Sequence, residues 1–218
     1  MTLGDIGRPT VDQFAGLRRL LLVPFVSAVH EDEELSALVE RYWEEAARQV
    51  RNLEERLGGL GQMYLEGAVV GGESEVEALK RASPAAAPFV RDAIGRGATL
   101  RKTEDADTLL EAIDLQRCLM VAQGSPTVAN RLFEWLADAR KRRYATIARR
   151  IDETLPAEGV AVLVISQDHQ VQFASDIRVF YVAPPVLDQI HRWVRAHVGI
   201  GPMAEDTAQA AGGEPPDG

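Results

Sequence analysis

Short apolar runs alternate with stretches of helical period along the chain. The runs cover residues 19–29, 61–72, 98–102, 160–166 and 177–183. The fourth run, VAVLVIS, is apolar at every position up to Ile165, which is typical of a strand buried on both faces of a parallel sheet. Strands that alternate with helices indicate one α/β domain, with a mainly parallel sheet covered by helices.

Two long helices are predicted, over residues 31–57 and 125–155, because apolar residues recur there at three- and four-residue spacing. In the second, the expected buried stripe consists of Val128, Leu132, Trp135, Leu136, Ala139, Ile147 and Ile151. Shorter helices are expected from Ser74, which forms a capping box with Glu77, from Ser83, and after Pro185. Thr103 is expected to cap a helix over 105–113, while residues 114–121 fit either a helix or a buried strand.

The ends of the chain have few residues to bury. Residues 1–17 are expected to be a flexible N-terminus, and residues 201–218, rich in Gly, Pro and Ala, a disordered tail. The α/β domain then covers residues 18–200.

Composition narrows the classes of function. A formal net charge of −9 argues against nucleic acid as the partner, because such proteins neutralise phosphates with basic residues. No apolar stretch reaches the length of a membrane span and the N-terminus has no signal-peptide pattern, so we expect a cytoplasmic protein with no membrane partner. The one cysteine, Cys118, has apolar neighbours and is expected to be a buried, inert thiol.

Two histidines, His30 and His169, follow predicted strands, at the edge where α/β folds bind ligands. Glu66 is a carboxylate inside a predicted strand that is otherwise apolar, so it requires a partner or a proton if it is buried. Each also has a structural interpretation: His30 as a loop residue pairing with nearby carboxylates, Glu66 as a residue turned to water at Gly67, and His169 as a turn residue beside Asp168.

Arg143 is the fourth candidate, because it falls on the apolar stripe of the second long helix. A guanidinium there requires a carboxylate or a bound anion, unless the side chain extends past the helix edge to water. The surrounding basic run, residues 140–150 with Tyr144 interleaved, is either a solvated face or a surface for RNA phosphates or an acidic partner.

Gly71 and Gly72 lie between a strand and a helix, where backbone amides can hold an anion. The spacings of the nucleotide-binding glycine motifs are missing, and no GxSxG, HExxH or CxxC motif occurs.

The order of these pieces resembles the superfamily of erythromycin esterases, ChaN-type haem-uptake proteins and TraB-type proteins. The matching segments span roughly residues 20–170: FVSAVHEDEEL with His30, MYLEG with Glu66, RYATIARRI with Arg143, and VLVISQDH with His169. The chain departs from the pattern in lacking Gly and Glu before His30, in carrying Tyr144 where the family has Asp, and in approaching His169 through SQD.

The resemblance implies a hydrolase-like site acting on a small-molecule substrate. One histidine would act as general base, Glu66 would orient it, and Arg143 would hold an anionic group. Alternatively, His30, Glu66 and His169 would bind one divalent metal for metal-assisted hydrolysis. The resemblance assigns no role to residues 176–198.

Two other hypotheses remain open at this point. One is a non-catalytic module that binds a protein, nucleotide or RNA through the basic helix 140–150. The other is a structural subunit with an apolar surface formed by Tyr181, Trp193 and Val194.

Overall fold

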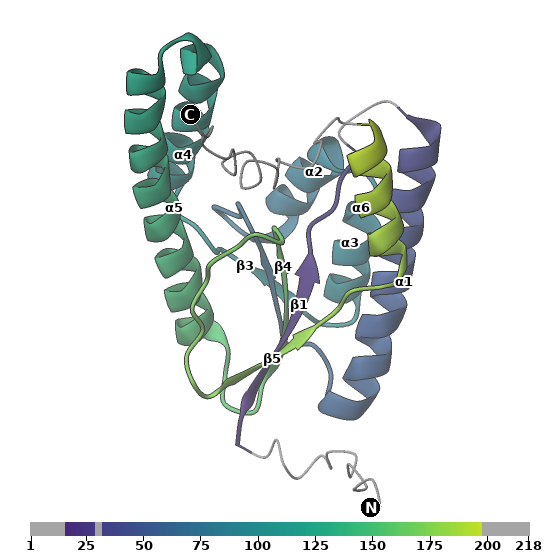
Figure 1. The fold of residues 1–218 in the computed structure, drawn as a ribbon. Helices are drawn as coiled ribbons and strands as arrows, with labels where there is room; N and C mark the ends of the chain where they lie inside the picture. The colour runs from purple at the N-terminus through teal and green to yellow at the C-terminus, as the bar shows by residue number, and fades with distance from the viewer. Residues whose placement is uncertain (1–15, 29–31, 198–218) are drawn as a thin grey trace, which may run out of the picture.

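The computed structural model describes residues 16–28 and 32–197, except for the side chain of Gln123, and shows an α/β fold with a five-stranded parallel sheet (Figure 1). The strands are β1 (Arg18–Pro24), β2 (Gln62–Leu65), β3 (Thr99–Arg101), β4 (Val160–Ile165) and β5 (Ile177–Tyr181). They lie in the order β3-β2-β4-β1-β5, and every neighbouring pair is parallel. The predicted fold class is confirmed.

Helices cover both faces of the sheet. They are α1 (Glu33–Leu57), α2 (Gly72–Ala82), α3 (Ala87–Gly95), α4 (Ala106–Val121), α5 (Pro126–Thr154) and α6 (Val186–His197). The two long helices, α1 and α5, match the predicted ranges closely, and residues 114–121 belong to helix α4. Among the described residues, none of the helices is both long and apolar enough to cross a membrane.

The strands are apolar on both faces because each face has its own core. Along β1, Leu21 and Val23 pack into the core beneath α1, α2, α3 and α6, whereas Leu20 and Leu22 pack beneath α5. Figure 1 shows α1, α3 and α6 on one side of the sheet and α5 on the other. This two-sided burial explains the continuous apolar runs.

Pro24 is compatible with a strand that has a neighbour on each side because it is the last residue of β1. The chain continues with Phe25, whose amide donates to the carbonyl of Ile165 at 2.8 Å. Helix α1 fixes the same end: the Tyr42 hydroxyl donates to the Pro24 carbonyl at 2.6 Å, and the Trp43 indole donates to that of Val26 at 2.9 Å. The carboxyl end of β1 is therefore held firmly against α1.

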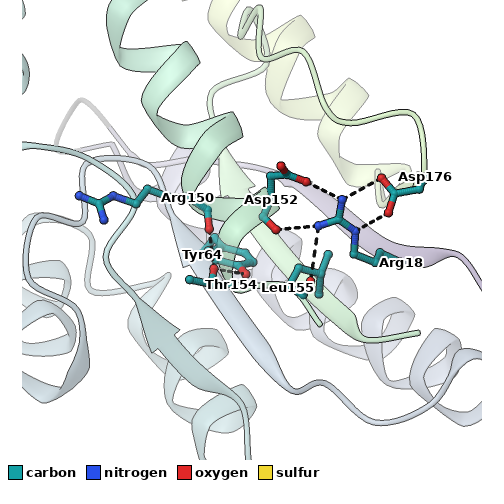
Figure 2. A network of polar contacts seen from close by, with 7 residues as sticks. All are labelled: Arg18, Tyr64, Arg150, Asp152, Thr154, Leu155 and Asp176. Atoms are coloured by element: carbon teal, nitrogen blue, oxygen red, sulfur yellow. Dashed lines mark hydrogen bonds and ion pairs between the residues drawn. The ribbon is translucent and has the colours of Figure 1, made fainter. Parts of the chain in front are cut away.

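The opposite, amino edge of the sheet is closed by an ion-pair network around Arg18 (Figure 2). The guanidinium of this buried residue contacts Asp176 at 2.7 Å and Asp152 at 2.5 Å, and it also donates to the carbonyl of Asp152 at 2.8 Å. The Arg18 charge lowers the pKa of Asp176, first through their hydrogen bond. These contacts join the starts of β1 and β5 to the end of α5.

Helices α4 and α5 form a hairpin that projects beyond the sheet (Figure 1). The hairpin has a small core of its own, in which Ala112 of α4 packs against Leu136 and Ala139 of α5. The prediction that Val128 and Trp135 are buried is wrong: they are 51% and 52% exposed. Leu136 and Ala139 face α4, whereas Ile147 and Ile151, further along α5, face the sheet. The first turns of α5 lie beyond the sheet, so apolar residues there are not covered by it (Figure 1).

Three further local expectations are wrong. Helix α2 begins at Gly72 with Gly71 as its cap, so Ser74 lies inside the helix rather than at a capping box. Thr103 does not cap α4, whose cap is Asp105; its hydroxyl donates instead to the carbonyl of Leu65 at 2.5 Å. Cys118 is exposed, because α4 packs mainly against α5 and leaves its other side open.

Candidate functional site

The carboxyl ends of β2 and β4 meet at Glu66 and Ser166, each of which directly follows its strand. The Glu66 amide donates to the carbonyl of Val164 at 2.9 Å. Its carboxylate accepts a hydrogen bond from the Ser166 amide at 2.8 Å through Oε2. Glu66 therefore reaches across the edge of the sheet instead of turning away to water.

Arg143 of α5 approaches the same edge and makes an ion pair with a second carboxylate, Glu104. Its Nε and Nη2 donate to the two oxygens of Glu104 at 2.5 and 2.8 Å, in bidentate geometry. Nη2 also contacts Glu66 Oε1 at 3.4 Å. The Arg143 side chain is 13% exposed, so this guanidinium lies inside the protein and does not extend to water.

Glu104 is the functional candidate that sequence reasoning missed. Its side chain is 1% exposed, and its Oε1 accepts a further bond from the Gly67 amide at 2.7 Å. It lies just after β3, at the edge of the sheet for which His30 and His169 are predicted. In the sequence it stands between Thr103, the predicted cap, and the predicted helix from Asp105, so it breaks no pattern there.

His169 lies in the loop after β4. Its Nδ1 accepts a hydrogen bond from the amide of Val171, two residues further along the chain, at 3.3 Å. A backbone amide always donates, so Nδ1 carries no proton and the neutral ring carries its proton on Nε2. Burial lowers the pKa of His169 below its ordinary 6.5, although the negative charges of Glu66 and Asp168 raise it. At neutral pH His169 is thus a neutral ring with a donor at Nε2.

Tyr144 belongs to the site as well, next to Arg143 on α5. Burial and the charge of Glu66 raise the pKa of its hydroxyl, while a hydrogen bond to the Ser166 side chain and the charge of Arg140 lower it. The net direction is upward, so Tyr144 keeps its proton at neutral pH and can donate a hydrogen bond. In the sequence, Tyr144 is marked only by its position directly after Arg143, where the superfamily that the chain resembles has Asp.

The structure therefore brings three of the four candidates to one edge. Glu66 contacts Arg143 directly, and its charge acts on His169. The fourth candidate, His30, lies outside the described residues. Within the described ranges no three His, Cys, Asp or Glu side chains are arranged to hold a metal, and the metal set expected from the resemblance requires His30.

A cavity of about 330 Å³ opens beside this cluster. Glu66, Gly67 and Arg143 line one side, and α2 with Phe25 lines the other. The lining is mostly apolar around a few convergent polar groups, which is the usual composition of a small-molecule site.

The glycine pair after β2 does not leave an open anion site. The amides of Val70 and Gly71 both donate to Glu75 Oε2, at 3.2 and 3.4 Å, so a carboxylate of the chain already occupies them. Gly71 has φ +79°, and a Cβ there would lie 2.8 Å from the Leu100 carbonyl oxygen. This glycine is therefore explained by backbone packing between β3 and α2.

Most arginines of the basic run are already paired with carboxylates. The pairs are Arg142–Glu111, Arg143–Glu104, Arg149–Glu153 and Arg150–Asp105. A phosphate-binding face would instead present its guanidinium groups to solvent without such partners. The expected apolar surface near the C-terminus is also reduced, because Trp193 is buried while Tyr181 is exposed.

Comparison with known proteins gives no relative: no family model, no curated protein and no solved structure matches the chain.

Proposed function

We propose that the protein is a hydrolase whose site is the cluster of Glu66, Tyr144, Arg143 and His169 at the carboxyl edge of the sheet. The observation that supports it is the position of the Glu66 carboxylate, which accepts a bond from the Ser166 amide and contacts Arg143 on the wall of a cavity. We include in this proposal the resemblance to the superfamily of erythromycin esterases, ChaN-type and TraB-type proteins, which implies a hydrolase-like site.

In this proposal Glu66 is the general base. Each of its oxygens accepts one bond, from Ser166 or Arg143, and a carboxylate oxygen has a second lone pair for a water molecule. Its side chain is 18% exposed, so water in the cavity can reach it. Arg143, itself held by Glu104, keeps the carboxylate in one orientation.

The role of His169 differs from the general base expected from the sequence. Its Nδ1 is occupied by the Val171 amide, so the ring offers Nε2–H as a donor. With the Tyr144 hydroxyl it would stabilise the negative charge that develops on a carbonyl oxygen when water attacks. The reaction is the addition of water to an acyl group: the proton moves to Glu66, and the leaving oxygen or nitrogen takes it back as the acyl bond breaks.

The test uses the 4-methylumbelliferyl ester of pentanoic acid and the matching amide of 7-amino-4-methylcoumarin. Glu66→Gln is expected to reduce kcat/KM by about 100-fold or more, the usual effect of losing a general base. His169→Asn and Tyr144→Phe should reduce kcat rather than raise KM. Glu111→Gln, which removes a carboxylate from an exposed ion pair on α4, is the control and should leave the rate unchanged.

Circular dichroism of each variant separates loss of activity from loss of fold. Equal rates for the wild type and Glu66→Gln, or no turnover of either compound by the wild type, would overturn the hydrolase proposal. The second candidate function, a binding module that uses helix 140–150, would then be preferred. It predicts that Arg140 and Lys141, which have no ion pair among the described residues, matter more than His169.

A further inference from the structure

Arg140 differs from the other arginines of the basic run of α5. Its neighbours Arg142 and Arg143 each have a carboxylate partner, as do the two arginines further along the helix. Arg140 is half-buried, and no carboxylate of the described residues lies within ion-pair distance of it. A guanidinium that is partly withdrawn from water and lacks a partner is suited to a bound anion.

The position of Arg140 relates it to the candidate site. It precedes Tyr144 by four residues on α5, so the two side chains lie on the same face of the helix, separated by a rise of about 6 Å. The positive charge of Arg140 also lowers the pKa of the Tyr144 hydroxyl, against the larger upward effects of burial and of Glu66. Arg140 is therefore one turn nearer the start of α5, on the part of the helix that belongs to the α4–α5 hairpin (Figure 1).

The charges around Glu66 differ in sign from the charge of Arg140. Glu66 and Glu104, at the floor of the site, share ion pairs with one cation, Arg143, which leaves an excess of one negative charge there. A substrate anion at the floor would be repelled. One turn nearer the start of α5, the Arg140 guanidinium makes no ion pair among the described residues, although the negative charge of Asp168 also acts on Tyr144. Arg140 can therefore bind an anion directly.

We infer that Arg140 binds a carboxylate of the substrate, so that the preferred substrates are acyl compounds with an acid group several atoms from the scissile carbonyl, such as half-esters of dicarboxylic acids. This inference rests on the proposed function for the position of the scissile group. The carboxylate site itself is independent of any reaction, because binding of a dicarboxylate reports on it directly.

The kinetic test compares two 4-methylumbelliferyl esters with the same chain length, the glutarate half-ester and the pentanoate ester. They differ only in a terminal carboxylate or methyl group. We expect the wild type to prefer the glutarate ester, and Arg140→Gln to raise its KM roughly 10- to 100-fold, as for loss of one charged hydrogen bond. KM for the pentanoate ester should not change.

The matched control is Lys141→Gln, which removes the same charge from the next, exposed residue. It should leave both KM values unchanged. An equal effect of Arg140→Gln and Lys141→Gln would mean general attraction of anions to α5 and would overturn the inference.

A binding measurement distinguishes failure of this inference from failure of the proposed function. Glutarate is titrated into the wild type, Arg140→Gln and Lys141→Gln by calorimetry. If neither ester is hydrolysed but Arg140→Gln alone weakens glutarate binding, the carboxylate site stands and the hydrolase does not. If both esters are hydrolysed at equal rates and Arg140→Gln changes nothing, the hydrolase stands and the inference is overturned. Absence of both binding and hydrolysis overturns both.

Discussion

The ion pair between Glu104 and Arg143 is the contact on which the site depends most, and its strength can be measured by a double-mutant cycle. Glu104 is 1% exposed and Arg143 13%, and the two are joined by bidentate hydrogen bonds of 2.5 and 2.8 Å. Removing one member of such a buried pair leaves the other charge without its partner. That loss typically lowers the free energy of unfolding by about 3–5 kcal/mol.

The two single variants should differ slightly. Glu104→Gln leaves Arg143 near Glu66 as a weaker partner at 3.4 Å, so we expect a loss near the lower end, about 3 kcal/mol. Arg143→Met leaves Glu104 buried with no cation, and we expect about 4 kcal/mol. The double variant has neither charge. We expect it to lose about 4 kcal/mol rather than the sum of 7, which gives a coupling free energy of about 3 kcal/mol.

The assay is urea unfolding followed by circular dichroism at pH 7, with the free energy extrapolated to water. The control cycle uses Glu111→Gln and Arg142→Met, because that pair also involves an arginine of α5 but its side chains are 48% and 52% exposed. Its coupling should not exceed about 0.5 kcal/mol. If the Glu104–Arg143 coupling were as small as that of the control pair, the two charges would be solvated, and the description of a buried, fixed Arg143 would be refuted.

Three further outcomes are expected. In NMR titrations, the His169 ring should have a pKa below 6.5 and should carry its proton on Nε2 when neutral. Because the Glu66 charge raises the pKa of His169, the pKa should be lower still in Glu66→Gln. A His169 pKa above 6.5 would contradict the burial of the ring. Because the unfolded ring binds a proton more readily, the His169 contribution to stability is lost as pH falls from about 6.5 through the lower folded pKa. Cys118 should react with Ellman's reagent in the native protein at the rate of a free thiol, whereas a buried thiol would react only on unfolding. Val121→Ser should change the free energy of unfolding by less than about 0.5 kcal/mol, since Val121 is 87% exposed. Leu136→Ala in the hairpin core should lower the free energy of unfolding by about 2–4 kcal/mol. Similar losses for the two variants would mean that Val121, at the end of the hairpin, is covered.

The elements of the fold could be predicted because their signals are local. The run from Val160 to Ile165 is apolar at each position, and α1 keeps one apolar stripe over its whole length. What failed was burial at the tip of the hairpin. Trp135 has the spacing of a core residue, but the periodicity of one helix does not reveal whether another element lies against it.

The candidate site was predicted only in part because its residues come from separate segments. Glu66 and Arg143 were selected since each breaks an apolar pattern. Glu104 breaks none, because an acid near a helix start already has a local explanation in the helix dipole. Tyr144 is apolar enough to fit the stripe itself, and only the fold shows that its hydroxyl lies beside Ser166.

The charge balance of the cluster is the strongest argument that Glu66 has more than a structural role. Glu104 alone neutralises Arg143 with bidentate geometry, so the fold does not need a second carboxylate there. The bond from Glu66 to the Ser166 amide requires only an acceptor, which a glutamine would supply equally well. Glu66 therefore carries a negative charge that neither the Arg143 ion pair nor the edge of the sheet requires. It also lies on the wall of a cavity, and a charged residue of this kind is expected at a functional site.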